Sequence, residues 1–541
     1  MRRRQLDALA RDTFDLLVVG GGITGCGIAR DAALRGLRVA LVEKDDFASG
    51  TSSRSSRLVH GGLRYLEHGY LHLVFEASGE RRRLLRLAPH LVRPLEFIWP
   101  VYAGARVPQW KLHAGLTLYD ALALFRNVAT HRRLSVRQIS AREPSLRREG
   151  LVGGARYFDA ATDDARLTLA NAIGAHEAGA VVVNHAAVAE LLVRDGAAYG
   201  ARVLDRLAEA RIDVRAKVIV NATGPWSDEL RRLVESDAAV KASRAAVRGS
   251  KGVHIAVARD RLGNHGALTL LSPNDGRVMF VLPGSRQTII GTTDTFTDAT
   301  PDDVRADEAD VAYLLQAANT FFPDARLTRE DVVSAWAGIR PLMAAGVDNA
   351  DPGDASREHA ISENAHGVVS ITGGKLTTYR VMAAEVVDVA SARLGRRARH
   401  RPPTINRPLP GGDLAYIDEA ITAAERATAD AELARHLVHA YGSRWSAVAD
   451  EIAAPGGAER IAGPSTIGEM RYAVRREMAC TIGDLLLRRT HLAFETRDHG
   501  KEIAPRVAAG IADLLDWNEA AIAVALQAYA REVKRIFDID P

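Results

Sequence analysis

Cysteine is almost absent from this chain, and so are long apolar runs. The 541 residues include two cysteines, Cys26 and Cys480, too few for a disulfide framework or a cysteine-ligated metal site, and this is typical of a reducing cytosol. No segment approaches the roughly 18 uncharged apolar residues that a membrane-spanning helix requires. The first ten residues hold three arginines without an apolar stretch, so we expect no signal peptide.

Apolar and charged residues are present in ordinary amounts, 47% and 26%, as in soluble globular proteins. A chain of this length is expected to form two or three domains. The net charge is only +4, but residues 54–133 hold 13 Lys or Arg against 5 Asp or Glu. Such a positive region suits an anionic substrate or an anionic membrane surface, and a solvated face with salt bridges is an equal alternative.

The most informative motif is a glycine-rich turn near the N-terminus. Residues 16–19 are typical of a buried parallel strand, a helix follows, and a second strand over residues 38–42 comes directly before an acid. The glycines of this G-x-G-x-x-G motif are Gly20, Gly22 and Gly25, and the acid is Glu43. In this setting the glycines permit a tight turn and the close approach of a pyrophosphate, while the acid accepts hydrogen bonds from a ribose. The motif therefore predicts a dinucleotide site.

Two further strands end in glycines. The strand over residues 214–220 leads into an Ala-Thr-Gly turn, and the strand over residues 367–372 leads into two glycines and a helix. A helix N-terminus beside a flavin stabilises negative charge on the ring. One nucleotide motif would leave NAD open as the cofactor, whereas three widely separated sites favour FAD. The predicted FAD contacts in these segments are Thr223, Gly224, Gly373, Gly374, Leu376 and Thr377.

The remaining patterns predict the domain organisation. Short apolar runs over residues 240–335 indicate a mixed β-sheet, a Pro-rich segment at 402–412 indicates a linker, and helical periodicity follows it. We expect an α/β protein: a doubly wound, Rossmann-like FAD-binding domain, an inserted mixed β-sheet substrate domain and a C-terminal all-helical domain. The expected FAD-binding segments are 1–90, 150–235 and 336–400, the substrate segments are 91–149 and 236–335, and the helical domain is 405–541.

Longer motifs resemble those of one family, the FAD-dependent glycerol-3-phosphate dehydrogenases. They are the loop at 48–67, with its His-Gly-Gly-Leu-Arg-Tyr sequence, and the segments 337–342 and 372–380. The tail around residues 484–490 is similar to the C-terminal domain of that family, so the match covers nearly the whole chain. The resemblance implies a glycine-oxidase-like flavoprotein that oxidises sn-glycerol 3-phosphate to dihydroxyacetone phosphate by hydride transfer and reduces a membrane quinone. Related oxidases reduce oxygen instead.

The resemblance also implies roles for individual residues. The loop residues that would contact FAD are Thr51, Ser52, Ser53, Gly61 and Gly62. The residues that would bind the substrate are Arg64, Tyr65, Arg357 and Lys375, since a phosphate dianion needs two or three cationic donors. His254 would be the base, poised for proton transfer near neutral pH, and Arg340 would stabilise the developing alkoxide. Lys251-Gly252 departs slightly from the family pattern around the histidine. No H-E-x-x-H motif stands on a predicted helix, so no metal site is expected.

Other functions remain open at this point. An amine oxidase of the same superfamily, such as a glycine or sarcosine oxidase, would also need an arginine, but one suffices for a carboxylate, and the cationic set favours phosphate. A non-catalytic FAD-binding module is opposed by the intact pocket residues. The family further suggests a homodimer.

Residues 94–125 combine apolar residues with Arg106 and Lys111. This pattern predicts peripheral contact with the inner face of the cell membrane, by a cytoplasmic protein whose quinone acceptor is confined to the bilayer. The alternative is that these apolar residues pack inside the substrate domain. Arg81-Arg82-Arg83 is expected to face solvent or phospholipid rather than nucleic acid.

Overall fold

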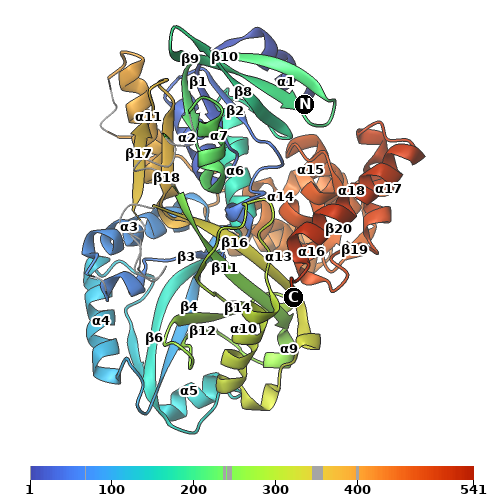
Figure 1. The fold of residues 1–541 in the computed structure, drawn as a ribbon. Coiled ribbons are helices and arrows are strands. Elements are labelled where there is room, and N and C mark those ends of the chain that lie inside the picture. Colours follow the sequence, from blue (N-terminus) through green and yellow to red (C-terminus); the bar gives the residue numbers. More distant parts are fainter. Residues whose placement is uncertain (1, 68, 236–238, 240–246, 344–357, 398–400) are drawn as a thin grey trace.

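The computed structural model describes residues 2–67, 69–235, 239, 247–343, 358–397 and 401–541. Two large sheets form the centre of the molecule, and a helical region is packed beside both of them (Figure 1). The first sheet has eight strands in the order β17-β18-β10-β1-β2-β7, and β9 extends it from β10 and pairs with β8. Its strands are β1 (Thr13–Val19), β2 (Val39–Val42), β7 (Val181–Val183), β8 (Ala186–Arg194), β9 (Ala197–Asp205), β10 (Ala210–Asn221), β17 (His359–Glu363) and β18 (Val369–Gly373).

The core of the first sheet is parallel and is covered on both faces. β1 runs parallel to β10 and to β2, and alternate residues of β1 point to opposite sides. Leu16 and Val18 pack with helices α2 (Ile23–Leu34), α6 (Asp164–Glu177) and α11 (Tyr379–Arg393). Leu17 and Val19 pack with α1 (Arg2–Arg11) and the β8–β9 meander. This burial on both faces explains the continuous apolar run of the first motif.

The second sheet is mixed and has ten strands in the order β15-β11-β14-β13-β12-β4-β6-β3, with β16 beside β11 and β5 beside β6. Its strands are β3 (Leu58–Val59), β4 (Val92–Tyr102), β5 (Arg132–Leu134), β6 (Leu151–Thr162), β11 (Val247–Ala258), β12 (Ala267–Leu271), β13 (Val278–Pro283), β14 (Gln287–Gly291), β15 (Thr295–Phe296) and β16 (Val332–Met343). Helices α3 (Leu71–Leu87), α4 (Gln109–Leu122), α5 (Val136–Arg142), α9 (Arg259–Leu262) and α10 (Glu308–Phe321) accompany it.

Three strands, β3, β6 and β16, cross the predicted domain boundaries, and β3 does so from the expected FAD-binding segment 1–90. The expected FAD-binding segments 150–235 and 336–400 include β6 and most of β16, but both strands pair within the second sheet. β6 lies antiparallel to β4, with Tyr157 opposite Phe97, and β16 lies along most of β11. The difference arises because pairing between residues far apart in the chain leaves no local trace in the sequence.

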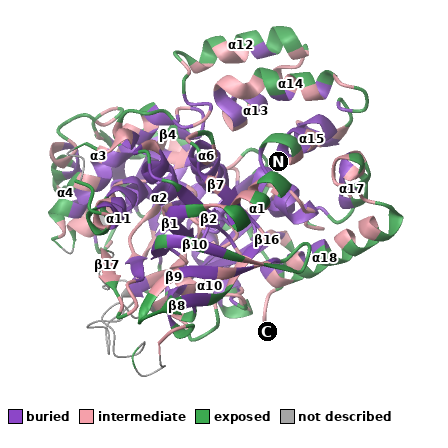
Figure 2. Ribbon diagram, turned by 90° about the horizontal axis from the view of Figure 1, so that it is seen from above, coloured by how far each residue is buried: buried purple, intermediate pink, exposed green. Residues whose placement is uncertain are grey.

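The C-terminal region is mainly helical, as expected, and also contains a short hairpin of β19 (Arg460–Ala462) and β20 (Ser465–Thr466). Its helices are α12 (Ile417–Thr428), α13 (Ala431–Tyr441), α14 (Trp445–Ala453), α15 (Ile467–Arg476), α16 (Leu492–Glu495), α17 (Ala504–Ile511) and α18 (Glu519–Phe537). The region shares a core with the second sheet, in which Phe494 packs on Trp336. Its outer helices α12 and α18 carry exposed faces, whereas β1, β2 and the C-terminal end of β10 are buried (Figure 2). Within the described ranges, none of the helices has the length and apolar character needed to cross a bilayer.

Candidate active site

The nucleotide half of the site forms where the parallel strands of the first sheet end. Val19 of β1 lies opposite Asn221 of β10 and Val42 of β2, and Asn221 lies opposite Ser370 of β18. All three glycine-containing motifs therefore meet at one edge of the sheet, where doubly wound sheets bind their ligands. A cavity of about 330 Å³ opens there. The predicted cofactor residues on its wall are Gly20, Gly22, Glu43, Thr51, Ser52, Thr223, Gly224, Gly373, Gly374 and Leu376.

The glycines of the first turn have separate structural reasons. Gly20 has a φ of +108°, which side chains rarely adopt, and a Cβ on Gly25 would lie 1.9 Å from the carbonyl oxygen of Gly20. Gly22 is different, because the nearest atom to a Cβ there is the hydroxyl oxygen of Ser52 at 3.3 Å. The space beside Gly22 adjoins the N-terminus of α2, whose N–H groups attract anions. This open cradle fits the pyrophosphate of FAD.

Glu43 lies at the end of β2 and is buried on the cavity wall. Its Oε2 accepts the N–H of Gly21 at 2.6 Å, and its Oε1 accepts the N–H of Asp45 at 2.9 Å. Burial, together with the nearby charge of Asp45, raises the pKa of Glu43 to about 7. A ribose hydroxyl that donates to this carboxylate would favour its charged form, as the predicted role requires.

Several predicted cofactor residues line neither this cavity nor a second one, described below, that adjoins it. They are Gly25, Ser53, Gly61, Gly62 and Thr377. Thr377 binds the backbone of His60 through its hydroxyl, and the N–H of Gly61 donates to Tyr119 and Asp159. These contacts attach the loop that carries them to its surroundings, and direct contact with FAD remains a prediction for this group.

The substrate half is a second cavity of about 210 Å³ that shares Thr51, Ser52 and Lys375 with the first. Its wall brings together four of the predicted residues from four parts of the chain: Tyr65, His254, Arg340 and Lys375. Lys375 places its ammonium 3.6 Å from the centre of the Tyr65 ring, a cation–π contact. Arg357 and the side chain of Arg64 lie outside the described part of the chain, so their roles stay predictions.

Arg340 is held in place by groups in the loop between β14 and β15. Its Nη1 lies 3.0 Å from the carboxylate of Asp294, and its Nη2 donates to the hydroxyl of Thr292 at 3.1 Å. A Cβ on Gly252 would lie 2.5 Å from Nη2, so this glycine leaves room for the guanidinium. Sequence reasoning missed Asp294 and Thr292 because nothing local marks them as partners of Arg340.

His254 lies on β11 and is only 2% exposed. Its Nε2 is 2.8 Å from the hydroxyl oxygen of Ser56, and its ring stacks on Trp336 at 5.5 Å between ring centres. Burial, followed by the positive charges of Arg340 and Arg57, lowers the pKa of His254 to about 3. The expected titration near neutral pH is therefore not found without substrate, and the imidazole is neutral and able to accept a proton.

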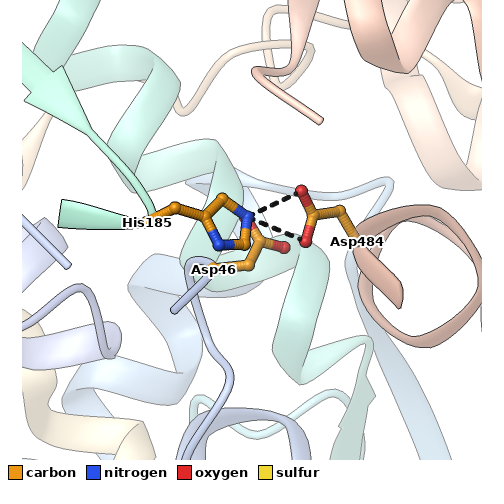
Figure 3. A group of neighbouring side chains, drawn as sticks. All are labelled: Asp46, His185 and Asp484. Carbon is orange, nitrogen blue, oxygen red and sulfur yellow. Dashed lines mark hydrogen bonds and ion pairs between the residues drawn. The ribbon is translucent and has the colours of Figure 1, made fainter. Parts of the chain in front are cut away.

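A cluster that sequence analysis did not identify joins the helical region to the nucleotide half. Asp46, His185 and Asp484 lie within ligand distance of one another (Figure 3). Their oxygens are already hydrogen-bonded: Asp46 accepts from Arg488 and Arg489. Asp484 accepts from His185, from Arg488 and from the residues just before it in the chain. Because these bonds occupy the carboxylates, the cluster acts as an ionic clamp between domains. A second group, Asp163, Asp164 and His491, anchors the loop at 55–57 in the same way.

The comparisons with known proteins bear on the family and the cofactor of the chain. A family model described as FAD dependent oxidoreductase matches residues 15–380, and one described as C-terminal domain of alpha-glycerophosphate oxidase matches residues 402–522. A glycerol-3-phosphate dehydrogenase of Synechocystis sp. is 36% identical over 541 residues, with 97% of each chain covered. An aerobic glycerol-3-phosphate dehydrogenase of Staphylococcus aureus is 35% identical over 539 residues, covering 97% of this chain and 95% of that one.

Solved structures show the same likeness. The X-ray structure of the glycerol-3-phosphate dehydrogenase from Bacillus halodurans complexed with FAD matches with a TM-score of 0.81 and 33% identity, over 99% of this chain and 98% of that one. Glycine oxidase from Geobacillus kaustophilus matches with a TM-score of 0.54 and 21% identity, over 72% of this chain and 99% of that one, which shows a shared fold alone.

Proposed function

This chain belongs to the family of FAD-dependent glycerol-3-phosphate dehydrogenases, and we propose that it oxidises sn-glycerol 3-phosphate to dihydroxyacetone phosphate and passes the electrons to a membrane quinone. FAD is its cofactor, as the sequence predicted. When bound, FAD supplies the acceptor for the hydride that leaves C2. The observation that carries the proposal is the continuity of the cofactor cradle with a cavity that presents His254, Arg340 and Lys375 together.

The cations of this cavity suit a phosphate dianion. Lys375 offers a point charge, and Arg340 offers a fixed fork of N–H donors oriented by Asp294. We propose that Arg64 and Arg357 complete the phosphate site. This set distinguishes the chain from an amine oxidase of the same fold, whose carboxylate substrate would need a single arginine.

His254 is the proposed base for the substrate hydroxyl. Arg340 and Arg57 disfavour the charged imidazolium, and a bound phosphate dianion acts against that effect and raises the affinity of the ring for a proton. Arg340, on the wall of the same cavity, is the proposed group that stabilises negative charge on the C2 oxygen as its proton leaves. Substrate binding thus prepares the base for the reaction.

Anaerobic flavin bleaching tests the proposal. The purified yellow protein should lose its flavin absorbance on addition of sn-glycerol 3-phosphate and should keep it with glycine or sarcosine. The reduced enzyme should then be reoxidised faster by a water-soluble quinone than by oxygen. Bleaching by an amine instead would favour the amine oxidase, and faster reoxidation by oxygen would favour the oxidase.

Helices α3 and α4 support the proposed membrane contact. The surface that they offer is smaller than the whole segment 94–125 considered from the sequence. Residues of β4, such as Phe97 and Trp99, are buried in the second sheet, as the alternative held. The exposed apolar side chains are instead Leu71, Phe75, Trp110, Leu118, Leu124 and Phe125, and Trp110 is 72% exposed. Arg81 is buried against Asp159, so the expectation that the whole arginine triplet faces outward is wrong for this residue.

Exposed cations complete this surface, with Arg82 on α3, Lys111 on α4 and Arg126 in the loop after α4. We propose that it lies in the head-group region of an anionic membrane, where the quinone is found. Trp110→Ser with Lys111→Glu should abolish salt-sensitive sedimentation with anionic liposomes. Arg211→Glu on the distant strand β10 is the matched control and should bind like the wild type. Equal binding of all three proteins would contradict the contact. A homodimer remains a prediction from the family.

A further inference from the structure

We propose that Ser56 is a catalytic residue that relays the proton of the substrate hydroxyl to His254. This inference deepens the proposed function and rests on it. The hydroxyl oxygen of Ser56 is 2.8 Å from Nε2 of His254. Both residues line the 210 Å³ cavity that also holds Arg340 and Lys375. The hydroxyl is therefore placed between the reacting space and the base.

The loop around Ser56 is firmly anchored on both sides. The preceding residue, Ser55, binds the carboxylate of Asp164 through its N–H at 3.2 Å and through its hydroxyl at 2.6 Å. The following residue, Arg57, donates its N–H to the hydroxyl of Ser55, and its carbonyl accepts the N–H of Thr162. Such anchoring holds the Ser56 hydroxyl against the imidazole. A proton relay requires that the distance between the Ser56 oxygen and Nε2 of His254 stay short.

The imidazole ring is oriented by its packing. Trp336 stacks on one face, and a Cβ on Gly291 would lie 2.4 Å from Cδ2 of the ring, so no side chain can intervene on that side. The other ring nitrogen, Nδ1, is buried and has no hydrogen-bond partner within the described residues. The Ser56 hydroxyl is thus the hydrogen-bond partner that the structure gives to the ring, at Nε2.

The proposed relay conserves both protons and electrons. His254 begins as the neutral tautomer that carries its proton on Nδ1. The C2 hydroxyl of the substrate gives its proton to the Ser56 oxygen, while the original Ser56 proton moves to Nε2. The C2–H bond breaks with both of its electrons, for which bound FAD is the acceptor, and the C2–O bond becomes a carbonyl. Ser56 ends unchanged and His254 ends as imidazolium, which later releases its proton to solvent.

Ser56→Ala is the direct test, with Ser56→Thr as the variant that keeps a hydroxyl. In stopped-flow reduction of the holoenzyme by sn-glycerol 3-phosphate, Ser56→Ala should be slower by about a hundredfold, on the scale of general-base catalysis. Ser56→Thr should recover most of the rate. Combining Ser56→Ala with His254→Gln should cost little more than His254→Gln alone, because the two residues act as a unit.

Two further measurements separate a catalytic role from a structural one. Dihydroxyacetone phosphate lacks the C2 hydroxyl, so its affinity for the oxidised holoenzyme should change less than twofold in Ser56→Ala, and FAD content should be unchanged. The solvent deuterium effect on flavin reduction should differ between Ser56→Ala and the wild type. Ser391→Ala, which removes a buried hydroxyl from α11, is the control and should resemble the wild type in every assay.

The outcomes distinguish the relay from the function on which it rests. If sn-glycerol 3-phosphate fails to bleach the wild type, the proposed function itself fails. If the wild type bleaches and Ser56→Ala is reduced at the same rate with the same solvent effect, the relay is wrong. Loss of FAD or of dihydroxyacetone phosphate binding in both Ser56 variants would also overturn it, because the residue would then be structural.

Discussion

The two halves of the site are built in different ways. The nucleotide half consists mainly of backbone: glycines and helix N-termini at the ends of adjacent parallel strands, with Glu43 as its one acid on a strand end. The substrate half consists of charged and polar side chains brought together from β11, β16 and the turn after β18. A site built from backbone requires that certain positions carry no side chain. A site built from side chains requires particular functional groups at certain positions. The two halves should therefore fail in different ways when they are mutated.

The largest effect of mutation is expected in the nucleotide half. It concerns Gly22 and Gly25, which are equivalent positions in the G-x-G-x-x-G motif but have different surroundings in the structure. Gly25→Val should prevent folding, because its Cβ would meet the Gly20 carbonyl oxygen at 1.9 Å. Gly22→Val should fold but lose FAD, because its nearest neighbour is Ser52 at 3.3 Å and the space it fills is the pyrophosphate cradle. Soluble yield, circular dichroism and the flavin-to-protein absorbance ratio measure the difference. Full flavin occupancy in Gly22→Val would show that the cradle is misplaced.

The next effect is expected in the substrate half, with the fold intact. Arg340→Ala should lower kcat by about a hundredfold, the scale of losing one oriented electrostatic donor. Asp294→Asn should lower it less, because the guanidinium loses its ion pair but stays in the cavity. FAD content should be normal in both variants, and Arg211→Ala on β10 serves as the control. Steady-state kinetics with sn-glycerol 3-phosphate decide the matter, and unchanged kcat in Arg340→Ala would remove this residue from the mechanism.

A smaller effect is expected at Lys375, which touches both cavities. If its ammonium holds the phosphate equally in the ground and transition states, Lys375→Ala should raise KM about tenfold and leave kcat nearly unchanged. Lys375→Arg should retain part of the affinity. Arg357→Ala is expected to behave like Lys375→Ala. A fall in kcat without a change in KM would show that Lys375 acts mainly in the transition state, as is proposed for Arg340 at the C2 oxygen.

The sequence reveals the nucleotide half more fully than the substrate half. β1, α2 and β2 lie within a few residues of their predicted positions because their signals are local: an apolar run, a turn of glycines and a helix. Their meeting with the ends of β10 and β18 follows from parallel topology.

His254 and Arg340 lie 86 positions apart in sequence, on paired strands of which only β11 was foreseen. Only the resemblance to the family identified them. Asp294 acts through Arg340 and carries no motif of its own, so local pattern could not single it out. Ser56 lies inside the loop at 48–67, but its pairing with His254 appears only in the fold. The partners in the ionic clamp of Asp46 with Arg488 and Arg489 are more than 400 residues apart in sequence. No local pattern distinguishes them from other charged residues, so the sequence could not predict the clamp.

The clamp gives the smallest of the expected effects, and it tests whether the helical region supports one half of the site or both. Asp46 lies three residues after Glu43, so the clamp adjoins the nucleotide half. Burial alone would lower the pKa of His185, but the facing carboxylate of Asp484 outweighs it, and the pKa of His185 is raised. A raised folded pKa gives stability that is fully present below the unfolded value of about 6.5 and is lost as the pH rises through the folded value.

His185→Asn, which keeps a hydrogen-bond donor but cannot be charged, should therefore lower Tm more at pH 6 than at pH 9, by about 1 °C, the scale of one charged hydrogen bond in a large chain. At pH 6 the variant should also release FAD more readily on dilution, while KM for sn-glycerol 3-phosphate stays constant. Thermal melts and flavin fluorescence measure both effects. A Tm difference that grows towards pH 9 would reverse the sign of the linkage. A change in KM with no change in FAD release would show that the helical region supports the substrate half instead.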